Sequence, residues 1–466
     1  MKKFLVVLTL LLVIAGGAPL FSGYKAEATL DQWVSYMDGA PGYDVSWDFY
    51  RKGWLSTDAV MLVRFNNPMD LPMGQGTSNG WVLPLHIHMV HGPLLVRDSF
   101  RLGWLSGRMI LSSEHEGLIK KYVKVEGEGP VFVSNLYMDL TGKLHINDYS
   151  LPFSIDQSGE TVRVDGYSGG GEMTLNKQFR YDGRLPSITF QGESGTMLLE
   201  GVNVSAKMNL NKLIAGTIAE GTTGLKFESL KTDLNDGENF EVDGLSIASS
   251  IDFDAEAPTA DMNIEVSMKE FISLSERISE LDLSVGFDNV SFSFLERYSE
   301  LVKQFGSLGA DGASMLAMQM SQLAATELLP YGPGISIDKL RFNSLEGSLN
   351  FNGKIEISPE AATKVNNPLS AINDVVVNAS GKIDKVLAAK YAKKSALRDL
   401  NNQMLQTGQE MNEEEKIATA EKQANVQLSM LILQGMLVED GDKYSLDFKF
   451  EDGKADLNGK PMPLPF

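Results

Sequence analysis

The feature that most constrains this chain is a regular alternation of apolar and polar residues between short turns rich in glycine, aspartate and asparagine. It is clearest in KYSLDFKFEDGKADLNG (443–459), where every second residue from Tyr444 to Phe450 is apolar. Residues two apart lie on the same face of a β-strand, and a pair such as Asp452-Gly453 favours a tight hairpin. We therefore predict a β-rich α+β protein built from long antiparallel meander sheets.

Helical periodicity interrupts this pattern in three places. FLERYSELVKQF (294–305) carries one apolar stripe, and the Met-rich ASMLAMQMSQLAATELL (313–329) ends before Pro330. The region 382–437 is the most helical, and the glutamates at 413–415 suit the first turn of its last helix, where carboxylates complement the helix dipole. A few amphipathic helices are thus expected in the C-terminal part.

The N-terminus predicts a membrane segment. After Lys2 and Lys3, residues 4–24 carry no charge, which at about 1.5 Å per residue is enough to span a bilayer core. Basic residues before this run place the rest of the chain outside the cytoplasm. A transmembrane helix within residues 1–25 is predicted, and the alternative is a signal peptide cleaved near Ala26-Glu27-Ala28.

Composition narrows the partners. A formal charge of −20 disfavours nucleic acid and general adhesion to an anionic membrane surface. The chain has no cysteine, so disulfides, thiolate metal sites and thiol nucleophiles are excluded. We expect a β-rich region over 26–290 and a mixed helix and strand region over 291–466 that continues the same sheet.

One motif occurs twice. YRKGWLSTDAVML (50–62) recurs as FRLGWLSGRMIL (100–111), which predicts a duplicated hairpin with a turn glycine before each Trp-Leu-Ser. Leu55 and Leu105 are expected to begin equivalent inward faces of the two strands that follow.

Each copy also places an arginine beside its tryptophan. Arg51 precedes Trp54, and Arg101 precedes Trp104. Such a pair could bind an anion or an aromatic ligand, but structural duplication is the favoured interpretation.

Three histidines lie close together in LPLHIHMVHGPLL. His86 and His88 share one strand face, whereas His91 is three residues further and points to the opposite face. Two ligands are too few for a tight zinc site, which needs three or four, and only His115 or His145 could complete one. The prediction is no metal, cofactor or catalytic residue, and a metal-binding protein or metal-dependent hydrolase that uses His86 and His88 is the alternative.

Other enzyme-like motifs fit ordinary strands and turns better. Residues 166–170 match Gly-x-Ser-x-Gly, but a nucleophile elbow needs a strand followed by a helix, and here a hairpin loop between strands is expected. The acidic stretches 232–238 and 455–460 lack the spacing of calcium loops and are interpreted as turns. Paired carboxylates for glycoside hydrolysis depend on tertiary distances that sequence does not give.

Four segments resemble the YdgA-like family. Residues 50–56 are similar to its aromatic-x-Arg-Gly-x-Phe-Ser motif, and 91–93 to its His-Gly-Pro. Residues 167–170 resemble a Phe-Ser-Gly-Gly turn, and 453–464 resemble its terminal strand-turn-strand. The resemblance extends over essentially the whole chain, but the second Arg-x-Gly-Trp copy and the histidines before His-Gly-Pro depart from it.

The resemblance implies a bacterial protein of unknown function, anchored in the inner membrane and facing the periplasm, with a link of one member to swarming motility and self-association. We expect a non-enzymatic envelope protein that binds lipid or a protein partner, with the 313–329 helix in an apolar groove. A structural homo-oligomer organised by the 382–437 helices is a further alternative.

Overall fold

The structure, a computed structural model, describes Asp31, Val34 and the ranges 43–65, 82–97, 100–111, 123–157, 159–214, 218–235, 237, 239–253, 257–305, 309–364, 372–407 and 411–462. The predicted membrane segment, residues 1–25, lies outside these ranges. Across the described ranges, no helix has both the length and the apolar character needed to cross a bilayer.

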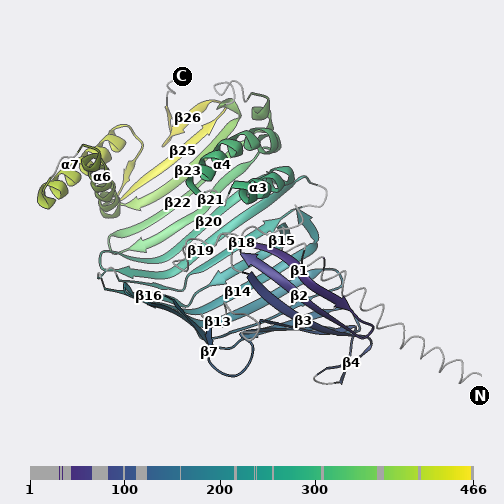
Figure 1. The fold of residues 1–466 in the computed structure, drawn as a ribbon. Helices are drawn as coiled ribbons and strands as arrows, with labels where there is room; N and C mark the ends of the chain where they lie inside the picture. The colour runs from purple at the N-terminus through teal and green to yellow at the C-terminus, as the bar shows by residue number, and fades with distance from the viewer. Residues whose placement is uncertain are drawn as a thin grey trace, which may run out of the picture. The chain divides into compact units, whose positions relative to one another are not determined.

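The described chain forms two compact units, each built on antiparallel strands as the alternation predicts. Unit 1 comprises Met1–Asn239, Ser250–Glu256 and Phe292–Ser321, and unit 2 comprises Phe240–Ser249, Ala257–Ser291 and Gln322–Phe466. Figure 1 shows many of these strands as long arrows, and the helices that it labels come late in the chain. The expected β-rich architecture with long antiparallel strands is confirmed.

In unit 1, neighbouring strands pair antiparallel in the order β1-β2-β3-β6-β8-β9-β12-β13-β14-β15. Their bounds are β1 Tyr43–Lys52, β2 Ser56–Phe65, β3 Val82–His91, β6 Leu105–Leu111, β8 Phe132–Met138, β9 Leu144–Ser150, β12 Tyr167–Met173, β13 Gln178–Gly192, β14 Gly195–Ile214 and β15 Ile218–Lys226.

Two long strands branch this sheet. One half of β13 pairs with β12 and the other half with β11, while β14 divides in the same way between β15 and β16. A side arm of short strands continues from β11 through β10 to β7. Their bounds are β7 Val123–Val125, β10 Phe153–Gln157, β11 Glu160–Val164 and β16 Ser229–Leu234.

The core of unit 1 lies against the first strands of this sheet. Alternate residues of β2, β3 and β6 form one buried cluster with Val45, as expected where one face of a sheet is covered. Its buried members are Val45, Ala59, Met61, Ile87, Met89 and Leu105.

The second copy of the repeated motif is not a hairpin. In the first copy β1 pairs directly with β2, as predicted. In the second copy β5 (Phe100–Leu102) pairs with β4 (Leu94–Val96) in a separate two-stranded sheet, while β6 pairs with β3 and β8. The prediction of a duplicated hairpin is therefore wrong for the second copy, because the residues after β3 supply a different partner strand.

In unit 2, the strands β19-β20-β21-β22-β23-β25-β26-β27 pair antiparallel in that order, and β17 and β24 pair with β19 and β25. The bounds are β17 Phe240–Asp243, β19 Thr259–Ser273, β20 Arg277–Ser291, β21 Gly334–Ser344, β22 Gly347–Ile357, β23 Val375–Asp384, β24 Val438–Asp440, β25 Lys443–Glu451, β26 Lys454–Leu457 and β27 Lys460–Met462. The strand β18 spans Ser246–Asp252.

The tight turns follow the predicted chemistry. Asp452 and Gly453 both have positive φ, 50° and 69°, between β25 and β26. Asn458 and Gly459 repeat this with 55° and 76° between β26 and β27. Two consecutive positive φ angles define the type I′ turn that suits the twist of a hairpin, so these residues are turn formers and the expected turn at 455–460 is confirmed.

The helices occur where the periodicity predicts them. A π-helical turn, Ala324–Leu328, and a 3-10 turn, Leu329–Tyr331, follow α4, so the segment ends around Pro330 as expected. The α-helices are α3 Phe292–Phe305, α4 Gly309–Leu323, α6 Lys385–Thr407 and α7 Glu413–Leu433, and further 3-10 turns are Pro359–Lys364 and Ile372–Asp374.

The start of α7 is fixed by capping. The Asn412 side chain accepts a hydrogen bond from the Glu415 backbone N–H at 2.8 Å, and three glutamates fill the first turn. This satisfies an N–H that has no partner within the helix and places negative charge at the positive end of the dipole.

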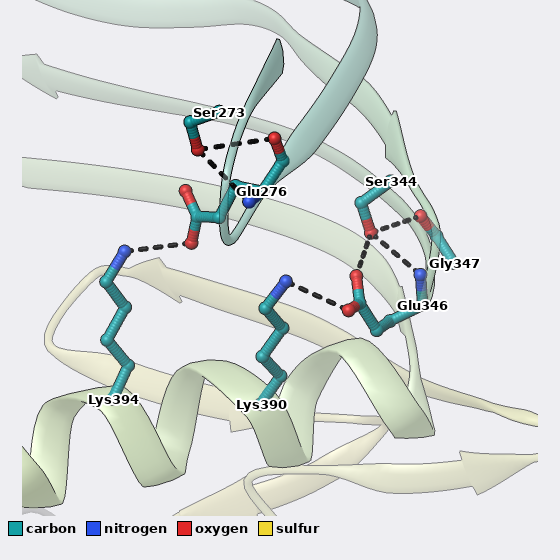
Figure 2. Close-up of polar contacts among 7 residues, drawn as sticks. All are labelled: Ser273, Glu276, Ser344, Glu346, Gly347, Lys390 and Lys394. Atoms are coloured by element: carbon teal, nitrogen blue, oxygen red, sulfur yellow. Dashed lines mark hydrogen bonds and ion pairs between the residues drawn. The ribbon is translucent and has the colours of Figure 1, made fainter. Parts of the chain in front are cut away.

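Two lysines attach α6 to hairpin turns of the unit 2 sheet, as Figure 2 shows. Lys390 Nζ lies 2.9 Å from Glu346, and Lys394 Nζ lies 2.8 Å from Glu276. Ser344 Oγ donates to the same Glu346 carboxylate at 3.2 Å. The hydrogen bond from Lys390 lowers the pKa of Glu346, and the one to Glu276 raises the pKa of Lys394. These are structural contacts of α6.

Candidate functional site

The His-Gly-Pro segment connects the two copies of the repeated motif. The His91 N–H donates to the Leu55 carbonyl of the first copy at 2.8 Å, and the Gly92 N–H donates to the Trp104 carbonyl of the second at 3.2 Å. Gly92 has a φ of 119°, which a residue with a side chain rarely adopts. The turn predicted for this segment is thus present, and it holds both Trp-Leu-Ser segments together.

His91 itself is a core residue. It is 1% exposed, and its Nε2 lies 3.0 Å from Thr57 Oγ1, which is also fully buried. Burial lowers the pKa of His91, and the charges of Lys52 and His88 lower it further. The imidazole is therefore neutral at neutral pH. It packs as a buried side chain between the two motif copies.

The β4–β5 hairpin that follows has two chemically different faces. The cross-strand pairs Leu94–Leu102 and Val96–Phe100 put four apolar side chains on one face. These side chains are 55%, 52%, 67% and 67% exposed, in the order Leu94, Leu102, Val96 and Phe100. Leu95, between them in sequence, is 1% exposed and points to the other face. The hairpin is thus fixed by one buried leucine and presents an apolar surface to solvent.

The inner side of this hairpin borders a pocket of about 350 Å³ in unit 1. Arg97 and Arg101 come from the hairpin, and the other lining residues come from β6, β8 and β9. None of the described lining residues is acidic. The lining consists of Arg97, Arg101, Ser106, Asn135, Leu136, Tyr137, His145, Ile146 and Asn147.

Polar and ring contacts hold the two arginines in place. Arg97 Nη2 donates to Asn135 Oδ1 at 3.3 Å, and the Arg101 guanidinium lies 5.6 Å from the centre of the Tyr137 ring. The Tyr137 hydroxyl donates to the Leu102 carbonyl at 2.6 Å, and His145 stacks on the same ring at 5.9 Å. Because guanidinium groups stacked on rings keep a fixed orientation, this pocket offers preoriented donors that suit an anion.

The predicted histidine pair is where strand geometry puts it. His88 is exposed and His86 half-buried on one face of β3, opposite to His91. His88 Nδ1 lies 2.7 Å from Asp58 Oδ1, and this hydrogen bond is the main cause that lowers the pKa of Asp58. His88 is thus engaged in a surface hydrogen bond with Asp58.

Among the described residues, no third histidine lies beside this pair on its face of the sheet. His145 is on β9, and β6 and β8 lie between that strand and β3, so three strand spacings, about 14 Å, separate the strands that carry His145 and His88. His115 lies outside the described residues. Among the residues that the structure describes, no three His, Asp or Glu side chains are placed to hold a metal ion.

Residues 167–170 of the Gly-x-Ser-x-Gly segment lie within β12, and Gly166 precedes this strand with a φ of 89°. Ser168 is on β12, opposite Tyr149 and Arg184 on its two neighbours, so the expected hairpin loop is wrong and a nucleophile elbow is not formed. The glycines are explained by packing: a Cβ on Gly169 would collide with the hydroxyls of Tyr167 and Tyr181. Gly-rich sequence indicated a turn, but here it makes room for tyrosine rings over a sheet.

These tyrosines form a polar cluster in unit 1. Their hydroxyls contact each other, and the Tyr181 hydroxyl also donates to Asp148 Oδ2 at 2.7 Å. Burial, followed by the contacts with Tyr167 and Asp148, raises the pKa of Tyr181. The phenol is therefore a neutral donor, not a base, and the cluster serves packing.

The surface of α7 is partly apolar. Val426, Met430 and Leu433 are 51%, 53% and 86% exposed along one side of the helix. On α4, Met315 and Met318 are exposed as well. The expected homo-oligomer and the apolar groove at 313–329 stay predictions.

Part of the pocket beneath the β4–β5 hairpin could be recognised from the sequence. The repeat singled out Arg101, and the histidine count singled out His145. Sequence reasoning missed Arg97, Asn135, Tyr137 and Asn147, which are ordinary strand residues until register places them together. The one available signal was the alternation in LLVRDSFRL, whose outward residues are apolar although the segment lies between two surface turns.

Comparison with known proteins adds a family but no activity. No curated protein matches the chain. The family model described as bacterial protein of unknown function (DUF945) matches residues 1–465. The expectation of a bacterial family of unknown function is thereby confirmed. From its first residue almost to its last, this chain is a member of the DUF945 family of bacterial proteins of unknown function.

Proposed function

We propose that this protein is a non-enzymatic envelope protein of the bacterial inner membrane that binds lipid on the periplasmic side. Residues 1–25 are the membrane anchor, since Lys2 and Lys3 precede an uncharged run long enough to span the bilayer. Its task is envelope maintenance through binding, without turnover.

The observation that carries this proposal is the apolar face of the β4–β5 hairpin. Four large apolar side chains on nine residues of chain are more than half exposed, and contiguous exposed apolar surface marks an interaction site. Arginines 97 and 101 on the same hairpin favour an occupant with anionic charge beside apolar chains. A phospholipid layer combines both properties.

The net charge of −20 would oppose this binding if charge were spread evenly. Charge is not spread evenly, because two arginines and one histidine line the neighbouring pocket, and of these the histidine, His145, is paired with Asp139 at 3.4 Å. Debye screening limits the effect of distant carboxylates to about 8 Å at physiological ionic strength. The two arginines therefore determine the charge that a ligand meets in this pocket.

Because the chain has no cysteine, one introduced cysteine can be labelled uniquely. The test uses the full chain in phospholipid vesicles with a polarity-sensitive fluorophore on Phe100→Cys and, as a matched control, on Leu175→Cys, which is 73% exposed in the same unit. We expect quenching by nitroxides in the lipid chains at position 100 and not at 175. Equal, water-like emission at both positions contradicts lipid binding, and concentration-dependent shielding without lipid quenching would identify a second copy as the occupant.

A further inference from the structure

We infer that the pocket beneath the β4–β5 hairpin binds a phosphate group, the head group of an anionic phospholipid being the source that fits its position. This inference rests on the proposed function and deepens it, because it names the ligand class of the same surface. It assigns Arg97 and Arg101 as the principal ligands.

The donor set defines the chemistry. Two guanidiniums, two side-chain amides, one imidazole and one serine hydroxyl line a space of about 350 Å³. Arginine forks match phosphate oxygens in two parallel hydrogen bonds, and amide and hydroxyl groups commonly add to such sites. A cationic ligand would find no carboxylate among the described lining residues, and the Asp139 carboxylate beside the lining already lies 3.4 Å from His145 and accepts a hydrogen bond from Thr141.

The geometry also favours the phosphate. Arg101 is held over Tyr137, and Tyr137 is in turn bonded to the hairpin backbone at Leu102. Arg97 is oriented by Asn135 on β8. A site whose donors are already oriented loses less side-chain entropy when the anion binds.

The corresponding arginine in the first motif copy has a different environment. Arg51 lies at the end of β1, 3.6 Å from Asp58 on β2, and is 74% exposed. An anion at Arg51 would be repelled by the Asp58 carboxylate. The two copies thus supply a binding residue and a matched control within one chain.

The position of the pocket connects it to the lipid surface. The hairpin turns Leu95, Arg97 and Arg101 toward β8, and its opposite face carries the exposed apolar side chains. The two faces of a strand pair are separated by about 10 Å with their side chains. An apolar face among acyl chains therefore leaves the arginines at the depth of the phosphates, as in amphipathic elements at membrane surfaces.

The experiment is a calorimetric titration of the full chain in phosphatidylcholine nanodiscs. The probes are short-chain phosphatidylglycerol below its micelle concentration, short-chain phosphatidylcholine and inorganic phosphate. The proteins are the parent, Arg97→Gln/Arg101→Gln, Arg101→Lys and the control Arg51→Gln. Removal of each arginine is expected to weaken phosphatidylglycerol binding about fivefold, hence about 25-fold for the double variant.

Three results would support the inference. The parent binds phosphatidylglycerol and the double variant does not. Arg101→Lys weakens this binding less than the double variant does, and Arg51→Gln leaves it unchanged. Competition by inorganic phosphate at similar affinity would support the phosphate site with free phosphate as its source. Equal binding of both lipids, or unchanged binding by a double variant that melts like the parent, overturns the inference.

Failure of the inference and of the proposed function can be told apart. The labelled Phe100 reports insertion of the hairpin, which apolar contact alone can produce. Insertion without preference for the anionic lipid removes the phosphate site and leaves lipid binding intact. Phosphate binding at the arginines without insertion removes lipid binding as the function and retains the phosphate site.

Discussion

The two copies of the Trp-Leu-Ser motif have nearly the same residues and different structures. The first copy is the exposed end of the β1–β2 hairpin, where Trp54 and Leu55 are 56% and 53% exposed. In the second copy Leu105 is 5% exposed, and the Trp104 indole donates to the Leu140 carbonyl at 3.0 Å. The difference shows that partner strands, rather than the motif itself, decide which copy is buried and which is exposed.

The largest expected difference concerns the glycines. A Cβ on Gly103 would lie 2.5 Å from the Met138 carbonyl oxygen and 2.8 Å from the Tyr137 ring, whereas one on Gly53 would meet only Ser56, at 3.1 Å. Gly103→Ala should reduce the free energy of unfolding of unit 1 by about 2–3 kcal/mol, and Gly53→Ala by under about 1 kcal/mol. Urea unfolding followed by tryptophan fluorescence measures both. Equal losses would show that the two turns are equally packed.

A smaller difference is expected for the tryptophans. Trp104→Phe removes the hydrogen bond to Leu140 and some packing, and should cost about 1–2 kcal/mol. The same change at the exposed Trp54 should stay within about 0.5 kcal/mol. The same unfolding measurement tests this, and a larger effect at Trp54 would contradict the assignment of the first copy as the more exposed one.

The link between the copies should depend on pH through His91. Its pKa is lowered in the folded state, so the neutral side chain contributes stability that is complete above its unfolded pKa of about 6.5. That contribution is lost as the pH falls below 6.5 through the folded pKa, because the unfolded chain then binds the proton more readily. His91→Gln should flatten the loss of stability between about pH 6.5 and 5 by about 1 kcal/mol, measured by unfolding at several pH values. If the pH dependence of the free energy of unfolding is the same in the variant and the parent, His91 does not cause it.

The smallest effect belongs to the first copy's surface ion pair. The partners Arg51 and Asp58 are 74% and 41% exposed, so Arg51→Gln should cost about 0.5 kcal/mol or less, and the cost should shrink in high salt. Melting at low and high ionic strength gives the comparison. A loss of unfolding free energy well above about 1 kcal/mol would mean that Arg51 also contributes to packing in the first copy.

Alternation and turn chemistry predicted much of the fold. Asp452-Gly453 and Asn458-Gly459 form the expected turns, and Asn412 with three glutamates starts α7 as helix rules require. These features depend on a few neighbouring residues. The second copy of the motif was mispredicted because β4, the partner of β5, lies in a segment too short to be recognised as a strand.

The pocket beneath the β4–β5 hairpin could be predicted from the sequence only in part. Arg101 could be singled out from the repeat, but Asn135 and Tyr137 are adjacent to it only through the pairing of β6 with β8 and the docking of Leu95. The hairpin loop predicted around Ser168 was wrong for the opposite reason. A run of glycines looks the same in sequence whether it forms a turn or lies in a strand beneath a tyrosine ring. Tertiary neighbours decide between those cases.

The central claim is that the second copy supports a lipid-facing surface and the first does not. The most direct measurement is photo-crosslinking in intact cells, with a photoreactive amino acid at Phe100 or at Leu55, which are 67% and 53% exposed. We expect crosslinks to phospholipid from position 100 and few or none from position 55. Lipid crosslinks of equal yield from both positions, or crosslinks from position 100 only to protein, would contradict it.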